Sequence, residues 1–361
     1  AGEQSCMDVM DDALGLLEDF GPEYGPGFSS HGPMAAEALL ALGRGDAVVD
    51  WVTAYRRRLR GNPSPGLPVF GGYWFEALGS IGRYADWVDC FEEELREEDW
   101  CTVLNVWVPR LLPGMVGAAW HGAIRTGHAV RSLNREESPA KIRELARALA
   151  YWAARYQSLP GFPLPRVEAR SPLAAIDRVP SLPDGERLKE GLIYEKVRRL
   201  GGFAPFERVI NLTEPPDDVW PFAVDLLEAF VRVYLANAKT RGSVITFIHG
   251  VTGPGAVCLM ATCLLPDISR VALRYAWQAS AALHAAIGRA IDRTAYDAYD
   301  GTTEDLVARA VQTGDEHAVK FTEVCLRAHR MDPRPVFLVA ARHAVDMLGR
   351  PPQDRATGTR D

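Results

Sequence analysis

Four histidines in three distinctive settings are the residues of this sequence that best suggest a metal ion. His121 and His128 delimit the segment HGAIRTGH, and His249 lies in the apolar segment FIHGVT. His31 stands just before the helical pattern that begins at Met34. Imidazole nitrogen binds zinc, copper and iron, so all four are candidate ligands. Taken singly, each is explained at least as well by an ordinary role, His31 at the surface and the others as hydrogen-bonded core residues.

The spacing of His121 and His128 places both imidazoles on one face of a predicted helix. Seven residues advance about 700°, only about 20° short of two turns, and separate the residues by about 10 Å along the axis. That distance is long for a single ion. A kink or π-bulge at the intervening glycines would close the gap. Two unrelated core histidines remain the alternative.

Lys320 lies between two apolar residues, Val319 and Phe321, and Val324 continues the apolar stripe. A lysine buried there must lose its charge or find an anion. A neutral amine can add carbon dioxide and form a carbamate, whose two oxygens can replace a carboxylate as a metal ligand. The sequence alone favours the alternative, a solvated lysine whose stem covers apolar surface.

Motifs of several common enzyme classes are absent from the chain. It contains no G-x-S-x-G elbow, no Walker A loop and no H-E-x-x-H pair. The Gly-rich run at 250–255 contains Pro254 and lies in a helical pattern, so a phosphate-binding role is disfavoured.

Four segments, in this order along the chain, resemble the questin oxidase-like family: SHGPM at 30–34, HGAIRTGH at 121–128, FIHGVT at 247–252 and DEHAVK at 315–320. The second and fourth are the most specific, and the resemblance runs from about residue 20 to residue 345. It implies a mostly α-helical oxygenase with one non-haem iron, held by four histidines and a carboxylated lysine. Carried over to this sequence, the implied ligands are His31, His121, His128, His249 and Lys320.

The resemblance also implies roles for residues around those ligands. Lys320 and His128 are the residues expected to take part in catalysis. Glu316 and His317 are expected beside the ligands rather than among them, since a three-residue step turns His317 about 60° away from Lys320. Arg125 is a further neighbour, with a structural ion pair as the favoured role. Independently of the resemblance, the residue types of Tyr24, Phe28, Tyr73, Trp74 and Trp120 suit the walls of an aromatic substrate pocket, and packing in the core explains most of them equally well.

The reaction that the resemblance implies is oxidative ring cleavage of a polycyclic aromatic polyketide such as an anthraquinone. Fe(II), dioxygen and carbon dioxide (as the lysine carbamate) are the implied cofactors. The need for a reductant such as NADPH, and the choice between Baeyer–Villiger-like insertion and dioxygenation, stay open. Two alternatives remain: a zinc-dependent hydrolase or lyase, for which five ligands are too many, and a metal-free helical protein that binds a polyketide.

The elements that position these residues are predicted to be helices, giving an all-α fold. Apolar residues recur at helical spacing, and the chain shows no strand–helix alternation. The predicted helices cover 34–42, 46–59, 84–98, 103–112, 115–133, 140–156, 220–238, 244–264, 268–291, 303–312, 317–329 and 335–348. We expect one compact multi-helix domain over 1–349, interrupted by a long Pro-rich loop or lid at 158–190, and a flexible tail at 350–361.

The composition of the chain limits the kinds of molecule that the protein is expected to bind. A net charge of −7 and a pI of about 5.7 disfavour nucleic acid and anionic membranes as partners. The six cysteines form no C-x-x-C motif and are expected to be reduced thiols. The sequence shows neither a signal peptide nor an uninterrupted apolar span of about 18 residues. We therefore expect a cytoplasmic protein that acts on a small aromatic molecule.

Overall fold

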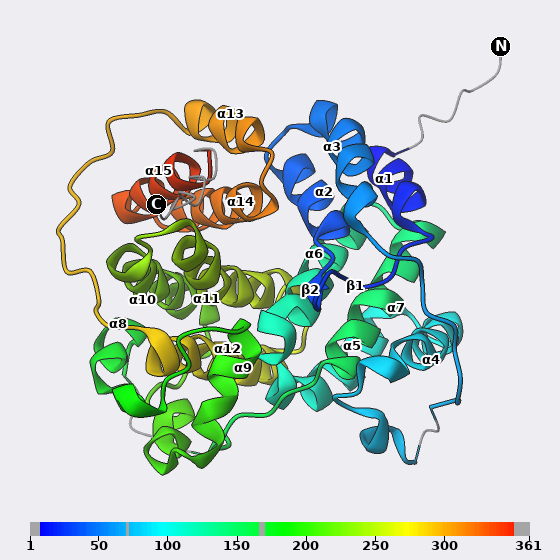
Figure 1. The fold of residues 1–361 in the computed structure, drawn as a ribbon, viewed down its shortest axis with the longest axis horizontal. Coiled ribbons are helices and arrows are strands. Elements are labelled where there is room, and N and C mark those ends of the chain that lie inside the picture. Colours follow the sequence, from blue (N-terminus) through cyan, green and yellow to red (C-terminus); the bar gives the residue numbers. More distant parts are fainter. Residues whose placement is uncertain (1–7, 70–71, 166–169, 350–361) are drawn as a thin grey trace, which may run out of the picture.

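The computed structural model describes residues 8–69, 72–165 and 170–349, and within them it confirms the all-α prediction (Figure 1). The helices up to residue 154 are α1 Val9–Leu17, α2 Gly32–Ala41, α3 Val48–Tyr55, α4 Tyr84–Glu97, α5 Trp100–Leu111, α6 His121–Arg135 and α7 Pro139–Ala154. Those that follow are α8 Pro172–Ala175, α9 Ile193–Arg198, α10 Val219–Asn237, α11 Arg241–Met260, α12 Pro266–Ile287, α13 Thr303–Thr313, α14 Glu316–Met331 and α15 Pro335–Leu348. The predicted tail at 350–361 lies outside the described residues.

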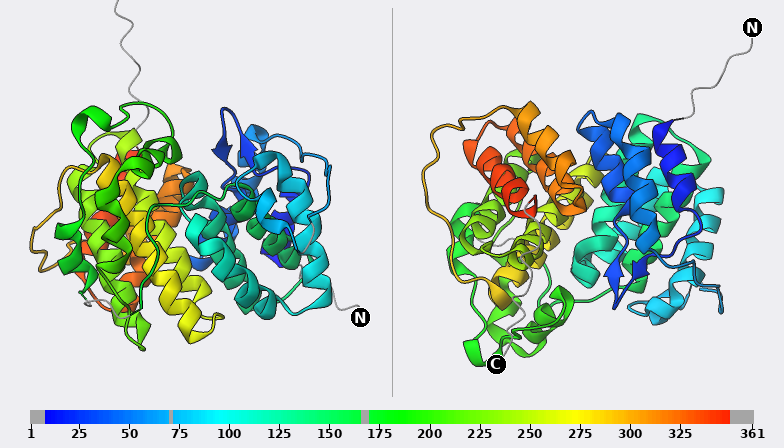
Figure 2. Two further views of the ribbon diagram at one scale, coloured as in Figure 1. Left: turned by 90° about the horizontal axis from the view of Figure 1, so that it is seen from below. Right: turned by 45° about the horizontal axis from the view of Figure 1, so that its top comes forward.

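Two groups of helices lie side by side, and the boundary between them runs along α6 and α11 (Figure 2). The group formed by α1–α7 contains His31 and His121, and the group formed by α10–α15 contains His249 and Lys320. Glycine lets the two groups approach closely: a Cβ at Gly127 of α6 would lie 2.6 Å from the carbonyl oxygen of Ala256 on α11. The candidate ligands therefore meet where the two groups pack together.

Helix α11 lies in the middle of this packing. Among the described residues it is the one helix long and apolar enough to cross a membrane, and 83% of its apolar window is buried inside the fold. Such burial is typical of a core helix. Thr240 caps its start by accepting the backbone N–H of Ser243, which fixes where His249 lies along the axis.

The structure adds two elements near the N-terminus that the sequence analysis did not predict. Helix α1 is capped by the side chain of Asp8. Strands β1 Glu23–Tyr24 and β2 Phe28–Ser29 form a small antiparallel hairpin. Two-residue strands are too short to show an alternating pattern, so periodicity could not reveal them.

The predicted helix at 115–133 begins later than expected, at His121. Ala118, Ala119 and Trp120 all have positive φ angles, 46°, 55° and 64°, and so form a left-handed turn. No side-chain pattern signals such a turn, because residues other than glycine rarely adopt it.

The Pro-rich segment is more regular than the predicted loop. Helix α8 and short 3-10 helices at Ile176–Arg178 and Asp184–Glu186 lie within it. Helix α8 begins at Pro172, and Pro183 directly precedes the last of these helices. Proline is compatible with the start of a helix, so a high proline content does not exclude short helices. Residues 166–169 of this segment lie outside the described residues.

Candidate metal centre

Six buried side chains from four helices converge at the boundary between the two groups of helices, and we call them the histidine cluster. Its members are His31 at the start of α2, His121 at the start of α6, His249 of α11, and Glu316, His317 and Lys320 of α14. Each is less than a tenth exposed. Four residues of the predicted ligand set, His31, His121, His249 and Lys320, are thus brought together.

Backbone carbonyls determine which nitrogen of His121 and His249 has the hydrogen. Nδ1 of His121 lies 2.5 Å from the carbonyl oxygen of Ala118, and Nδ1 of His249 lies 2.7 Å from that of Ile245. A carbonyl can only accept, so both Nδ1 atoms must donate. Burial is the main cause that lowers the pKa of both imidazoles well below the usual value, so the rings are neutral. Their Nε2 atoms consequently carry lone pairs and no hydrogen.

These lone pairs face one another. Nε2 of His249 lies 3.3 Å from Nε2 of His121, and Nε2 of His121 lies 3.0 Å from Nε2 of His31. Two ligands about 2.1 Å from one ion are about 3.0–3.4 Å apart at octahedral or tetrahedral angles. Each of these two distances therefore matches a pair of neighbouring ligands on a metal ion, and no hydrogen bond can explain the contact between His121 and His249.

His317 joins the cluster as a fourth imidazole, although the sequence analysis expected it beside the ligands. Its ring centroid lies 4.6 Å from that of His31 and 5.3 Å from that of His249. The carboxylate of Asp315 accepts from Nδ1 at 3.1 Å, so Nε2 is free to bind metal. A rotation of about 60° about the helix axis therefore leaves the ring of His317 within reach of this cluster.

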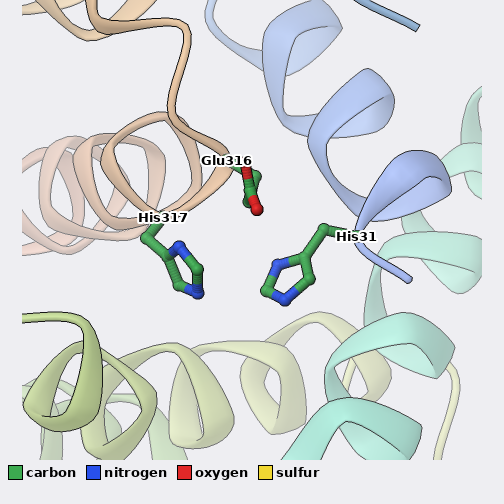
Figure 3. A group of neighbouring side chains, drawn as sticks. All are labelled: His31, Glu316 and His317. Atoms are coloured by element: carbon green, nitrogen blue, oxygen red, sulfur yellow. The ribbon is translucent and has the colours of Figure 1, made fainter. Parts of the chain in front are cut away.

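The carboxylate of Glu316 completes a compact donor set with two of these rings. Oxygen of Glu316 and ring nitrogens of His31 and His317 all lie within 4.8 Å of one another. Figure 3 shows Glu316 and His317 leaving the first turn of α14 toward His31 at the start of α2. An anionic oxygen donor is therefore present beside the imidazoles.

Lys320 lies behind His31, with Nζ 2.8 Å from Nδ1 of that ring. The side chain is 2% exposed, and burial lowers the pKa of its amine to about 7. The expectation of a solvated lysine is therefore wrong, and a neutral amine is accessible near pH 7.

His128 is not brought to the cluster, contrary to the prediction from the resemblance. Helix α6 runs without a break from His121 to Arg135, so no kink closes the two-turn gap. Nδ1 of His128 instead lies 2.7 Å from the carboxylate of Glu37. Arg125 also takes the structural role, donating to both oxygens of Glu144 at 2.6 and 2.7 Å.

Comparisons with known proteins add no assignment: no model of a protein family matches the chain, and no curated protein is significantly similar to it. What the chain does must therefore be inferred from the geometry of its own residues.

A cavity of about 480 Å³ opens next to the histidine cluster. Tyr24 and Phe28 of the hairpin line it, as predicted, together with the segment 191–194 that follows the Pro-rich region. The other predicted aromatic residues do not line it. Tyr73 is exposed, Trp74 packs against another tryptophan, and Trp120 is fully buried in the core.

Tyr55 supports the cluster in a way that the sequence did not reveal. Its hydroxyl accepts the backbone N–H of His31 at 2.8 Å, and its ring stacks on Trp51 at 4.8 Å between centroids. The sequence places Tyr55 within the predicted helix at 46–59 but does not reveal this role, because its partner His31 lies in a different element.

The left-handed turn before α6 holds His121 in place. The carbonyl of Ala118 orients the imidazole, and Ala118 and Ala119 both line the cavity. Each left-handed residue with a Cβ costs about 1–2 kcal/mol. Such strain is often retained at functional sites.

We expect Ala119→Gly to raise the free energy of unfolding by about 0.5–1 kcal/mol. Glycine adopts the left-handed conformation without the steric penalty of a Cβ atom. The greater conformational freedom of glycine in the unfolded chain offsets only part of this gain. Denaturant unfolding of the metal-free protein measures the effect. Ala123→Gly, in the regular part of α6, is the control and should be destabilising. An equal loss of unfolding free energy in Ala119→Gly and Ala123→Gly would show that the backbone at Ala119 is not strained.

Proposed function

We propose that the histidine cluster binds one transition-metal ion, iron(II), and that the protein is an oxygenase acting on an aromatic substrate in the adjoining cavity. The contact between Nε2 of His121 and Nε2 of His249 is the observation that supports this proposal most strongly. Two buried lone pairs facing each other repel, and a shared cation removes the repulsion. A buried polar atom without a partner would otherwise destabilise the fold.

The donor set favours iron over zinc. Ligand atoms of His31, His317 and Glu316 lie within 4.8 Å of one another, and two imidazoles with one carboxylate are the ligand set typical of non-haem iron(II) oxygenases, whereas zinc sites are almost always four-coordinate. Mixed nitrogen and oxygen ligands suit non-haem iron. When bound, iron supplies the one-electron chemistry that dioxygen needs to react with a closed-shell aromatic molecule. This donor set differs from the one implied by the questin oxidase-like resemblance, since His317 takes the place of His128 and Glu316 takes that of Lys320.

The residues around the ligands hold the imidazoles in the tautomer that binds metal. Hydrogen bonds from Nδ1 to a carbonyl or a carboxylate orient the Nε2 lone pair, as is usual for ligating histidines. For His31, the neutral amine of Lys320, or a carbamate oxygen formed on it, can accept from Nδ1. Lys320 therefore controls the tautomer of His31 through its own state.

The cavity walls suit a flat aromatic molecule with an acidic group. Tyr24 and Phe28 provide aromatic surface on one side. Arg58, whose Nη1 lies 3.6 Å from a carboxylate oxygen of Glu316, also lines the cavity, and its other N–H groups can pair with a phenolate or carboxylate. A hydroxylated polycyclic aromatic compound, such as an anthraquinone, combines these properties.

The experiment that tests this function is anaerobic loading with Fe(II), followed by dioxygen uptake in the presence of a panel of hydroxyanthraquinones. We expect about one iron per chain and uptake that depends on both iron and substrate. Labelled dioxygen, supplied with and without NADPH as a reductant, then separates the two reactions. Insertion incorporates one labelled atom and uses two electrons and two protons to convert the other to water, whereas dioxygenation incorporates both atoms and needs no reductant. A protein that takes up neither iron nor any other metal, but binds the aromatic compounds, would instead be a binding protein.

A separate measurement tests the carbamate on Lys320. If the amine adds carbon dioxide, bicarbonate should raise the iron affinity of the wild type several-fold, and labelled bicarbonate should give a carbamate signal in ¹³C NMR. Lys320→Met and Lys320→Arg should abolish both effects, because neither side chain forms a carbamate. Unchanged bicarbonate dependence in these variants would show that carbon dioxide acts elsewhere.

A further inference from the structure

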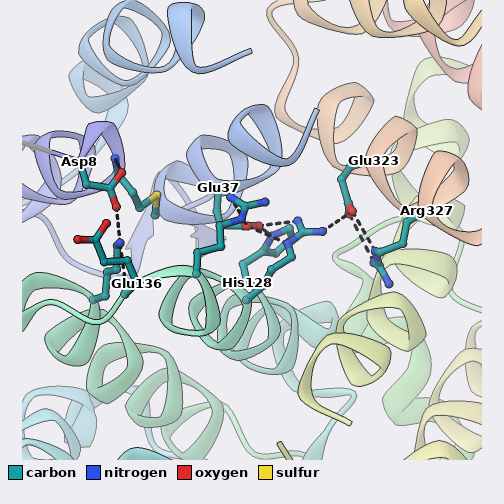
Figure 4. Close-up of polar contacts among 10 residues, drawn as sticks. Asp8, Glu37, His128, Glu136, Glu323 and Arg327 are labelled. Atoms are coloured by element: carbon teal, nitrogen blue, oxygen red, sulfur yellow. Dashed lines mark hydrogen bonds and ion pairs between the residues drawn. The ribbon is translucent and has the colours of Figure 1, made fainter. Parts of the chain in front are cut away.

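A buried ionic cluster lies beyond the histidine cluster and joins three of the helices that contain its members. Glu37 of α2 is fully buried and accepts from Arg131 of α6 at 2.8 and 2.5 Å. The same carboxylate accepts from His128 at 2.7 Å. Arg131 also pairs with Glu323 of α14. Figure 4 shows these contacts between the helices.

The ionic cluster extends to the fourth helix. Arg327 of α14 donates to Glu323 at 2.9 Å and to the carbonyl oxygen of Gly255 on α11 at 3.1 Å. Each of the four helices that supply the histidine cluster therefore also contributes a group to this second set of contacts.

The two sets of contacts lie at different levels along the same helices. Glu37 follows His31 by six residues, Arg131 follows His121 by ten, and Glu323 follows Lys320 by three. At about 1.5 Å per residue, the offset is between about 5 and 15 Å on each helix. Contacts at two levels fix both the rotation and the axial position of a helix, whereas contacts at one level leave it free to tilt.

Energetics suggest that this ionic cluster has a role other than stability. Buried ion pairs contribute little net stability, because desolvation offsets the attraction between the charges. Their better-attested use is to specify one arrangement of packed elements. Although burial opposes ionisation, the Arg131 guanidinium and the His128 hydrogen bond lower the pKa of Glu37 to about 2. Glu37 is therefore an anion at neutral pH and needs all of these partners.

We propose that Glu37 is a positioning residue of the metal centre: through Arg131 and Glu323 it fixes the register of α2, α6 and α14, and thereby the spacing of the Nε2 atoms. The inference rests on the proposed function in so far as the histidine cluster binds a metal ion. It assigns His128 to this positioning set rather than to the ligands.

The test compares Glu37→Gln with a matched control, Glu144→Gln. Both substitutions remove one carboxylate from a buried ion pair with an arginine of α6. The partner of Arg125, however, lies on α7, which supplies no member of the histidine cluster. Cobalt(II) is the probe, because its absorption bands report the geometry of the ligands. Affinity for cobalt and denaturant unfolding of the metal-free protein are measured for each variant.

We expect Glu37→Gln to lower the cobalt affinity about 10–100-fold, the range typical of groups that orient ligands, and to shift or broaden the absorption bands. Glu144→Gln should reduce stability to a similar extent but leave affinity and bands unchanged. If Glu37→Gln does not fold, Glu323→Gln takes its place; it weakens the contacts of Glu323 with Arg131 and Arg327 but leaves Glu37 paired with Arg131.

Two outcomes would overturn the inference, and they are distinguishable. Equal cobalt affinity and identical bands in Glu37→Gln and the wild type would refute the positioning role while leaving the metal centre intact. A wild-type protein that binds neither cobalt nor iron would refute the positioning role and the proposed function together.

Discussion

Replacing His249 by alanine is expected to lower the affinity for iron(II) at least about 100-fold, because loss of a direct ligand should exceed the 10–100-fold effect of groups that only orient ligands. His317→Ala should have a comparable effect, since its ring lies within the same cluster. His128→Ala should retain the ion and lose no more than about ten-fold in affinity, because Arg131 still holds Glu37 in place. Metal content after gel filtration and competitive titration with a chelator measure the three affinities.

The same three variants discriminate between two ligand sets. The set implied by the sequence resemblance contains His128, whereas the geometry places His317 in the cluster and His128 on Glu37. Loss of metal from His128→Ala, with retention in His317→Ala, would restore the set implied by the resemblance. Thermal unfolding of the metal-free variants is the control, since a variant that is merely unfolded would lose metal for a trivial reason.

Much of the fold was predictable because long amphipathic helices leave a periodic pattern. Helix α15 has the predicted bounds, and α4 and α13 differ from the prediction by one residue. The left-handed turn at 118–120 was not predictable, because alanine and tryptophan carry no signal for positive φ. Its effect on the site is large, since it moves the start of α6 to His121 and turns the carbonyl of Ala118 toward that ring.

The kinds of residue that form the candidate site could be predicted from the sequence, but which individual residues belong to it could be predicted only in part. His31, His121, His249 and Lys320 were identified from motifs, and the structure brings them together. His128 and His317 were misplaced for one common reason: helical spacing gives the direction of a side chain, but not which neighbouring helix it meets. Glu37 was missed altogether, because its role depends on contacts with residues more than 90 positions away in the sequence.

A substitution at Gly127, where α6 packs closely against α11, is expected to have the second large effect, a loss of stability. A Cβ at this position would lie 2.6 Å from the carbonyl oxygen of Ala256 and 2.8 Å from its Cβ, so α6 and α11 would have to separate. Overpacking against a backbone cannot be relieved by a side-chain rotation. We expect Gly127→Ala to lower the free energy of unfolding by about 3 kcal/mol. Because these helices contribute His121 and His249, the metal affinity should fall as well.

Gly15 of α1 provides the matched control for Gly127. It is a helical glycine at which an added Cβ would meet no atom within 4 Å, so Gly15→Ala should raise stability by about 0.5–1 kcal/mol through helix propensity alone. Denaturant unfolding of the two metal-free variants gives the comparison. If Gly127→Ala were as stable as the wild type, α6 and α11 would not be in close contact. The spacing of the Nε2 atoms of His121 and His249, which depends on that contact, would then need another explanation.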